Sequence, residues 1–374
     1  DKQFMEKHPN IKVKIINNTW AQHNQVVPTW ASSHTLPDLI YVHGSRIQPW
    51  AALGMMVALD PYLQQDKEFN LDDFFKIALE LYNRKGKYYA IPYDNGPIIL
   101  AYNADLLQAA GIKPPDENTT MDDLRAMAKQ LTKPGEQWGL DRLLTGSNEG
   151  LIARIGPWGG QVMNDDETQL LLNTEEAATA LQWWADILQK DKAAPSPAES
   201  QAIQGGPWLA GKVAFYPSAT WDTPTFHANA KFNWDVAPWP KGPKGQKTGA
   251  FGSGYGITTD SKHPDQSWTY LSEYLSKDGM EFMWGKSGRG SPARKSAYPS
   301  YLSSPIAPKH AKYFEDAENN YAEEGHPYKN LNAAQILDIF NREIDKVLRG
   351  TQTAKQALQN IQAQAGPLLA EGAK

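Results

Sequence analysis

Apolar and polar residues alternate close to the beginning of the chain. Ile11, Val13 and Ile15 are separated by lysines, a spacing of two that predicts a strand with one buried face. A second apolar run at residues 37–42 predicts another strand, and the residues between the two suffice for a crossover helix. This β-α-β rhythm recurs along the chain and indicates an α/β fold. Residues 1–9 read like the last turns of a helix.

Three longer segments have the apolar spacing of amphipathic helices. Thr120 and Asp123 form a capping-box pattern before an apolar stripe that continues to residue 131. A second stripe follows Thr174, and a third spans residues 336–347 and ends before Gly350. We therefore expect helices in all three segments, each packed through its apolar face.

Composition restricts the classes of protein that the chain can represent. Its 374 residues exceed the size at which one hydrophobic core stops growing, so two lobes are expected. The net charge is −5, and no cluster of Lys and Arg stands out that would neutralise a row of phosphates, which argues against a nucleic-acid partner. Without cysteine, disulfides, thiolate nucleophiles and cysteine-ligated zinc are excluded. The chain starts without a charged-then-apolar leader, which fits a cytosolic protein or a mature secreted one equally.

Motifs of the common reaction classes are missing from the sequence. It contains no HExxH pair, no GxSxG elbow and no calcium-loop pattern. Gly285, Lys286 and Ser287 resemble the end of a phosphate loop, but the preceding glycine is one residue too far away. The glycine-rich run at residues 252–256 lacks dinucleotide-binding spacing and instead indicates a close approach of backbones. The sequence therefore predicts no enzyme, no cofactor and no metal site.

Aromatic residues are abundant, with 13 Trp and 16 Tyr. Trp20, Trp158 and Trp221 lie at or near predicted strand or loop ends, where a flat ring beside hydrogen-bonding groups suits a pyranose. The alternative is that these tryptophans fill gaps between lobes. Four others lie in helical contexts and are expected in the core: Trp183, Trp184, Trp268 and Trp284.

Several segments in chain order resemble the family 1 extracellular solute-binding proteins of ABC transporters, of the sugar-binding, maltose-binding-protein-like type. The resemblance begins with GKYYAIPYD at 86–94 and AYNADLL at 101–107 and covers nearly the whole chain. It continues through WGG at 158–160, AGKVAF at 210–215, SATWD at 218–222, GSGYGI at 252–257 and GSPARKSA at 290–297.

This resemblance implies a two-lobe periplasmic-binding-protein fold in which the chain crosses several times between lobes and the ligand is held in the cleft between them. Crossings are expected near 97–102, 257–260 and 290–305, so that lobe 1 comprises residues 1–100 and 258–300 and lobe 2 comprises residues 101–257 and 301–374. The implied partners are a small-molecule carbohydrate and the permease subunits of an ABC transporter. A monomer in the periplasm, or outside the cell and tethered to the membrane, is expected. The family has a strand and most of a helix before the equivalent of Phe4, so we expect the mature chain to be longer.

The resemblance also implies a set of ligand-binding positions. The indoles of Trp158 and Trp221 would stack on sugar faces, aspartates would accept hydrogen bonds from hydroxyls, and arginines would donate. Four of these positions have an alternative: Asp222 as a helix cap, Arg46 and Arg289 in solvated or lobe-bridging salt bridges, and Tyr93 in hinge packing. The complete set is Trp20, His43, Ser45, Arg46, Tyr93, Asp94, Trp158, Gly159, Trp221, Asp222, Gly252, Ser253, Tyr255 and Arg289.

Two other functions stay open at this point. An anionic polyol such as a glycerol phosphate or a uronate would suit Arg46, Arg154 and Arg289, since arginine pairs with carboxylate or phosphate. A glycoside-processing enzyme would need two carboxylates, for which Asp94 and Asp222 are the candidates.

Overall fold

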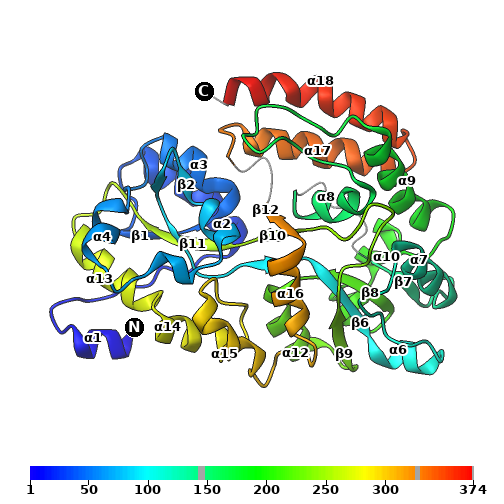
Figure 1. Ribbon diagram of the computed structural model, residues 1–374, viewed down its shortest axis with the longest axis horizontal. Coiled ribbons are helices and arrows are strands. Elements are labelled where there is room, and N and C mark those ends of the chain that lie inside the picture. Colours follow the sequence, from blue (N-terminus) through cyan, green and yellow to red (C-terminus); the bar gives the residue numbers. More distant parts are fainter. Residues whose placement is uncertain (142–147, 325–328, 373–374) are drawn as a thin grey trace.

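The computed structural model describes residues 1–141, 148–324 and 329–372. Two α/β halves lie side by side, each around its own sheet, and a small third sheet lies between them (Figure 1). The two-lobe α/β fold implied by the resemblance is therefore confirmed.

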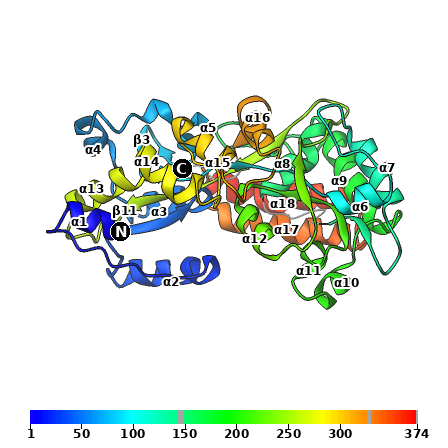
Figure 2. The same ribbon diagram turned by 90° about the horizontal axis from the view of Figure 1, so that it is seen from below.

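The first half is built on the antiparallel sheet β1-β11-β4. In this sheet β11 lies between β1 and β4, with Tyr41 opposite Tyr255 and His43 opposite Ser253. Seen from below, α2 lies on one side of the molecule, and α5 and α16 lie on the other (Figure 2). The elements of this half are α1 (Lys2–Lys7), α2 (Trp20–Ser32), β1 (Leu39–His43), α3 (Gly44–Ala52), α4 (Asp60–Gln65), α5 (Lys76–Glu80), β2 (Asn83–Arg84), β3 (Lys87–Tyr88), β4 (Ile91–Pro92), β11 (Ser253–Ile257), α13 (Pro264–Tyr274) and α14 (Lys277–Met280).

The second half is built on the four-stranded sheet β7-β8-β6-β9, in which β7 and β8 are parallel and the other pairs are antiparallel. The long helices α9, α17 and α18 pack against one another and cover one side of this half (Figure 1). Its elements are β6 (Ile99–Asn103), α6 (Ala104–Ala109), α7 (Met121–Gln130), β7 (Trp138–Leu140), α8 (Asn148–Ile155), α9 (Glu175–Gln189), α10 (Pro197–Ala202), α11 (Gly206–Leu209), β8 (Val213–Ser218), α12 (Thr223–Asn229), β9 (Trp234–Ala237), α17 (Ala333–Leu348) and α18 (Ala354–Gly372).

A hinge sheet of three short strands joins the halves in the order β12-β10-β5. Strand β5 (Gly96–Pro97) leads from β4 into β6, and β10 (Thr248–Phe251) leads from β9 back into β11. The helix α16 (Lys312–Asn320) runs into β12 (Ala322–Glu324), which pairs with β10 in parallel. Shorter turns complete the chain at η1 (Leu71–Asp73), η2 (Gly156–Trp158), η3 (Thr220–Asp222), η4 (Glu281–Gly285), η5 (Lys295–Ala297) and α15 (Tyr298–Leu302).

The position of β11 bears on the expected division into lobes. This strand falls within the range 101–257 assigned to lobe 2, yet it pairs with β1 and β4 of the first half. The division into 1–100 with 258–300 and 101–257 with 301–374 stays a prediction, and the pairing favours a second crossing at β10.

The prediction of a strand at residues 11–15 is wrong. Residues 11–19 form neither helix nor strand, and Ile15 and Ile16 are 57% and 54% exposed. Alternation produces a strand only where another strand supplies backbone partners. Strand β1 pairs with β11 instead, so the expected β-α-β pairing with residues 11–15 does not form among the described residues.

The three predicted amphipathic helices are confirmed as α7, α9 and α17. The capping box of Thr120 and Asp123 starts α7, the Thr174 side chain caps α9, and Gly350 after α17 has a φ of 70°. Trp184, Trp268 and Trp284 are buried as predicted, and Trp183 is partly buried. Local patterns therefore placed these three helices correctly, whereas the longest helix, α18, was not predicted.

Arg154 lies in the core of the second half between two indoles. Its guanidinium carbon is 5.1 Å from the Trp184 ring centroid and 5.3 Å from that of Trp239. Only 2% of the arginine is exposed. Cation–π attraction over two stacked rings stabilises the buried charge, so Arg154 serves packing.

Glu343 ties α17 to α18 through a buried polar network. It accepts hydrogen bonds from Lys346 (2.8 Å), Gln352 (3.2 Å) and Asn360 (3.1 Å) while only 1% exposed. Burial opposes ionisation, but these bonds outweigh it and lower the pKa of Glu343 to about 2. The carboxylate therefore stabilises the fold above its unfolded pKa near 4.5, and this contribution is lost as pH falls toward 2.

The Glu343→Gln substitution is expected to lower the free energy of unfolding at pH 7 by about 1–3 kcal/mol, because Lys346, Gln352 and Asn360 lose a charged, buried acceptor. Urea unfolding at pH 7, 4 and 3 measures this, and the deficit should shrink below pH 4.5. The matched control is Asp345→Asn on the same helix, whose exposed pair with Arg349 contributes little. Equal losses in both variants would contradict the role of the network.

Candidate functional site

A polar cluster lies around Asp94, where β1, β4 and β11 meet. The Tyr41 hydroxyl and Ser253 Oγ are 2.9 Å apart, and the Ser253 backbone N–H donates to Asp94 Oδ1 at 2.7 Å. Three strands distant in sequence thus hold one hydrogen-bonded group. Three predicted site residues, Asp94, Ser253 and the neighbouring Tyr93, lie together here.

Aromatic rings pack around this cluster. Tyr93 and Tyr255 have ring centroids 5.3 Å apart, and Tyr93 stacks on the buried Trp284 at 4.7 Å with an interplanar angle of 19°. Tyr274 contacts both Tyr255 and Trp284 edge-on. Offset and edge-on packing fixes ring orientations, so these rings form a rigid wall.

The carboxyl group of Asp94 has a raised pKa. Burial raises the pKa of its carboxyl to about 7, although the Ser253 N–H bond and the charge of Arg289 act in the opposite direction. Arg289 itself is exposed. At neutral pH the group exists in both forms and can accept or donate a hydrogen bond.

The end of β1 supplies a second group of polar side chains. His43 Nδ1 caps α3 by accepting from the Ser45 backbone N–H at 3.3 Å, and Ser45 Oγ lies 2.8 Å from the same nitrogen. Burial, with a smaller effect of Arg46, lowers the His43 pKa to about 4, so the ring is neutral at pH 7. Trp20 meets the His43 ring edge-on at 6.5 Å and is 56% exposed. Arg46 Nε is buried and has no hydrogen-bond partner among the described residues.

Trp221 is a residue of the second half that lies close to this site. It belongs to η3, and its ring lies so close to Gly96 that a Cβ there would be 3.0 Å from Cζ3. Gly96 follows Asp94 by two residues in the hinge. The indole therefore lies beside the polar cluster, partly buried, at the junction of the two halves.

Asp222 points back into its own turn. Its Oδ2 accepts from Ser218 Oγ at 3.0 Å and from the Ala219 backbone N–H at 3.4 Å. It precedes α12 but makes no capping bond to that helix. Its ligand role stays a prediction, and its observed contacts shape the η3 turn that carries Trp221.

Trp158 and Gly159 lie in a different environment. The Trp158 ring packs against Trp183 of α9 at 5.2 Å and is 8% exposed. Gly159 has a φ of 89° and faces the side chain of Lys244. The structure does not bring these two residues into contact with the Asp94 cluster, and their contacts favour the packing alternative.

The glycine-rich run 252–256 brings backbones together as predicted. A Cβ on Gly252 would overlap the carbonyl oxygen of Asp94, and one on Gly254 would lie 2.5 Å from that of Ile91. Both glycines therefore allow β11 to approach the segment that carries the site.

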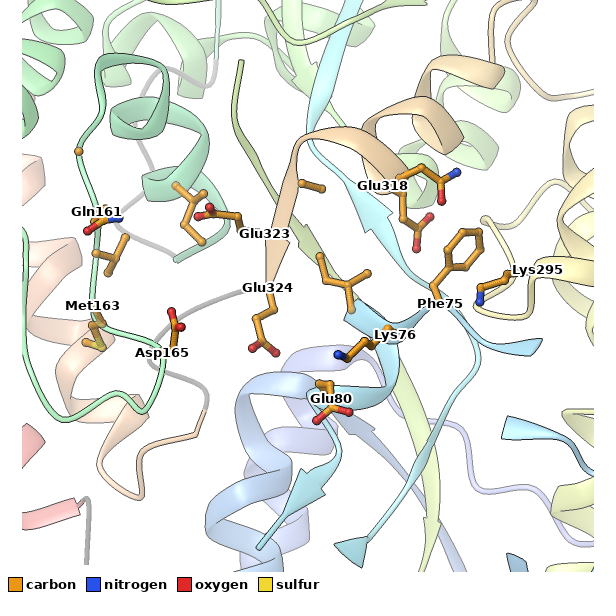
Figure 3. Close-up of a pocket in the computed structure, with 16 residues that line it drawn as sticks. Phe75, Lys76, Glu80, Gln161, Met163, Asp165, Lys295, Glu318, Glu323 and Glu324 are labelled. Carbon is orange, nitrogen blue, oxygen red and sulfur yellow. The ribbon is translucent and has the colours of Figure 1, made fainter. Parts of the chain in front are cut away.

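A cavity of about 600 Å³ lies elsewhere, between the halves, with residues of α5 and α16 in its wall (Figure 3). None of the fourteen predicted ligand residues lines it. Phe75 is its one aromatic residue, and five carboxylates face two lysines, an environment poorly suited to stacking sugars. Its charged residues are Lys76, Glu80, Asp165, Lys295, Glu318, Glu323 and Glu324.

Sequence reasoning missed several residues of the Asp94 cluster. Tyr41 lies in a predicted strand, and alternation with the buried Ile40 and Val42 could have indicated its side chain. Thr220 and Ser291, whose hydroxyls are 3.1 Å apart, are separated by 71 residues, and no local pattern connects them.

The chain belongs to the bacterial extracellular solute-binding protein family, whose model matches residues 1–314. It is therefore a solute-binding protein and not an enzyme. Among the described residues no three His, Asp or Glu side chains are grouped as metal ligands. The described helices also include none with the length and apolarity needed to cross a bilayer.

Known proteins of this kind are similar along most of the chain. The lactose-binding protein of Rhizobium radiobacter is 26% identical over 74% of this chain and 66% of its own length, just under two thirds. An arabinooligosaccharide-binding protein of Bacillus subtilis is 22% identical over 96% of this chain and 86% of its own. The solved structure of an ABC substrate-binding protein of Listeria monocytogenes in complex with cycloalternan has a TM-score of 0.88 at 24% identity, covering 98% of this chain and 93% of that one. That likeness establishes a shared fold.

Proposed function

We propose that this protein captures a carbohydrate, of mono- or oligosaccharide size, between its two halves and delivers it to an ABC transporter. The observation that carries the proposal is the meeting of aromatic rings with hydrogen-bonding groups at one junction. Trp221 from the second half lies beside Asp94, and Tyr255 and Trp20 belong to the first. Rings bind the apolar faces of a pyranose, and the polar groups bind its hydroxyls.

The protonation states at the site suit an uncharged polyhydroxyl ligand. His43 is neutral at pH 7 and therefore adds no charge to the site. Asp94, with a pKa of about 7, accepts or donates. Arg46 Nε adds a buried donor without a protein partner among the described residues. A ligand that leaves such groups without a hydrogen bond loses binding free energy, so the site favours ligands whose hydroxyls pair with them.

The anionic-polyol alternative is weaker. It relied on three arginines, and Arg154 is committed to the indoles of Trp184 and Trp239. Arg289 lies beside Asp94, which partly offsets its charge. The sugars that similar proteins bind according to their names, which are lactose, arabinooligosaccharide and cycloalternan, also support a sugar ligand.

The cellular setting follows from the same proposal. An extracellular solute-binding protein hands its ligand to permease subunits in the membrane, and we place this one in the periplasm or outside the cell, acting as a monomer. Hinge closure around the ligand would use the three strands of the hinge sheet.

A thermal-shift screen against lactose, maltodextrins and arabinooligosaccharides tests the proposal. A true ligand at 100 times its Kd adds about 2.7 kcal/mol to the free energy of unfolding. Glycerol phosphate and glucuronate serve as the anionic comparison. A shift with only the anions, or release of shorter sugars during incubation, would contradict carbohydrate capture without chemistry.

A further inference from the structure

A chain of hydrogen bonds crosses the hinge next to the candidate site. Thr220 of η3 is 3.1 Å from Ser291 between their hydroxyl oxygens, and Ser291 Oγ donates to the carbonyl oxygen of Asn95. The Asn95 side-chain amide then donates from Nδ2 to Glu318 Oε1 at 2.5 Å. Because Asn95 joins Asp94 to β5 and Glu318 belongs to α16, the chain links separate passages of the backbone between the halves.

Two buried acceptor atoms of the residues in this hydrogen-bond chain receive no hydrogen bond. Asn95 Oδ1 and Glu318 Oε2 lack a hydrogen-bond partner among the described residues, and the two residues are only 1% and 7% exposed. Each unpaired buried acceptor is costly. A single proton on Glu318 Oε2 turns one of these acceptors into a donor, and a carboxylic acid can then pair with a primary amide through two parallel bonds.

We infer that Glu318 is held as a neutral carboxylic acid paired with the Asn95 side-chain amide, and that this pair positions the segment from Asp94 to Gly96 for ligand binding. The role in binding rests on the proposed function; the acid–amide pair itself does not. Glu318 is thus a positioning residue, separated from Asp94 by Asn95.

The surroundings of Glu318 favour the neutral acid. Burial raises the pKa of its carboxyl to about 8, against the lowering effect of the Asn95 bond, and the negative charges of Glu315 and Asp94 raise it further. Figure 3 shows Glu318 on the side of the cavity where Phe75 and Lys295 lie. The titratable and charged groups around it are Asp94 from the site, Tyr298 from α15, Glu315 from α16, and, along the cavity, Lys76, Glu80, Asp165, Lys295, Glu323 and Glu324.

The sign of the pH dependence follows from the raised pKa. Between pH 4.5 and about 8 the folded protein keeps a proton on Glu318 that the unfolded chain has released. Stability therefore falls as pH rises through this window. Asp94 contributes a slope of the same sign up to about pH 7, so the effect of Glu318 is isolated only by comparing variants.

The Glu318→Gln variant tests the inference, because glutamine is permanently neutral and can keep both bonds to Asn95. We expect its Tm to exceed that of wild type by an amount that grows from pH 5 to pH 8. We also expect the Kd for the sugar found in the screen to rise at least threefold more in wild type than in E318Q between pH 7 and pH 9. The matched control is Asp316→Asn on the same helix, where a half-exposed carboxylate pairs with Lys312 at 2.9 Å, and this variant should keep the wild-type dependence of Tm on pH. Glu318→Ala should weaken sugar binding at every pH.

Parallel Tm curves of E318Q and wild type from pH 5 to pH 8 would overturn the inference, as would failure of the E318Q variant to fold. Parallel binding curves with diverging Tm curves would leave the acid–amide pair but overturn its role in positioning Asp94. Because Tm is measured without ligand, the absence of any sugar response would contradict the proposed function while the comparison of stability stands.

Discussion

Replacement of Trp221 by alanine is expected to weaken sugar binding about fivefold or more, a loss of about 1 kcal/mol or above that is typical of buried aromatic anchors. The indole lies at the junction of the halves, where its ring contacts Gly96 beside the Asp94 cluster. Removing it takes away the stacking surface that the second half contributes. Isothermal titration calorimetry with the sugar identified by thermal shift measures the change.

The matched control for this substitution is Trp158→Phe. Trp158 was also predicted to stack on the ligand, but its ring packs against Trp183. We expect this variant to lose stability and to keep the wild-type Kd. Unchanged affinity in the Trp221 variant would remove the stacking assignment, and a large loss in the Trp158 variant would move the site toward η2.

Gly252→Ala is expected to lower the free energy of unfolding by about 1–3 kcal/mol or more, because an added methyl group must displace packed backbone. Its Cβ would overlap the Asp94 carbonyl oxygen and lie 3.3 Å from Asn95 Cα. Shifting that segment would also displace the Asp94 carboxylate, so weaker sugar binding should accompany the loss. Urea unfolding and calorimetry measure the two effects.

Gly366→Ala provides the matched control, since Gly366 lies inside α18 and an added Cβ would meet only Gln362 Nε2, at 3.7 Å. There the same change should stabilise by about 0.5–1 kcal/mol, the difference in helix propensity between the two residues. A Gly252 variant as stable as wild type would show that β11 can move away from Asp94 without cost.

Local sequence patterns were sufficient to predict α7, α9 and α17. Side-chain caps at Thr120 and Thr174 and the glycine after α17 act within a few residues, so their signals are contained in short stretches of sequence. The alternation at residues 11–15 failed because strand formation depends on a partner elsewhere in the chain. The sequence alone therefore predicts interactions between residues a few positions apart, but not which strands pair.

The residues of the candidate site likewise include some that the sequence predicted and some that it did not. The family resemblance led to Asp94, Ser253 and Tyr255, which the fold does bring together. It gave no indication of the bond between Asn95 and Glu318, whose positions differ by 223. The environment of a tryptophan is equally non-local, which is why Trp158 and Trp221 carried the same prediction and occupy different surroundings.

The pairing of β1 with β11 also constrains how the molecule can assemble. Residues 39–43 receive their neighbouring strand from residues 253–257, so the sheet of the first half stays incomplete until residue 257 is available. Contacts between such distant segments slow folding, because a long loop must close before they form. A chain emerging from its N-terminus therefore spends a long interval with an unsatisfied strand edge, a state in which chaperones can hold it.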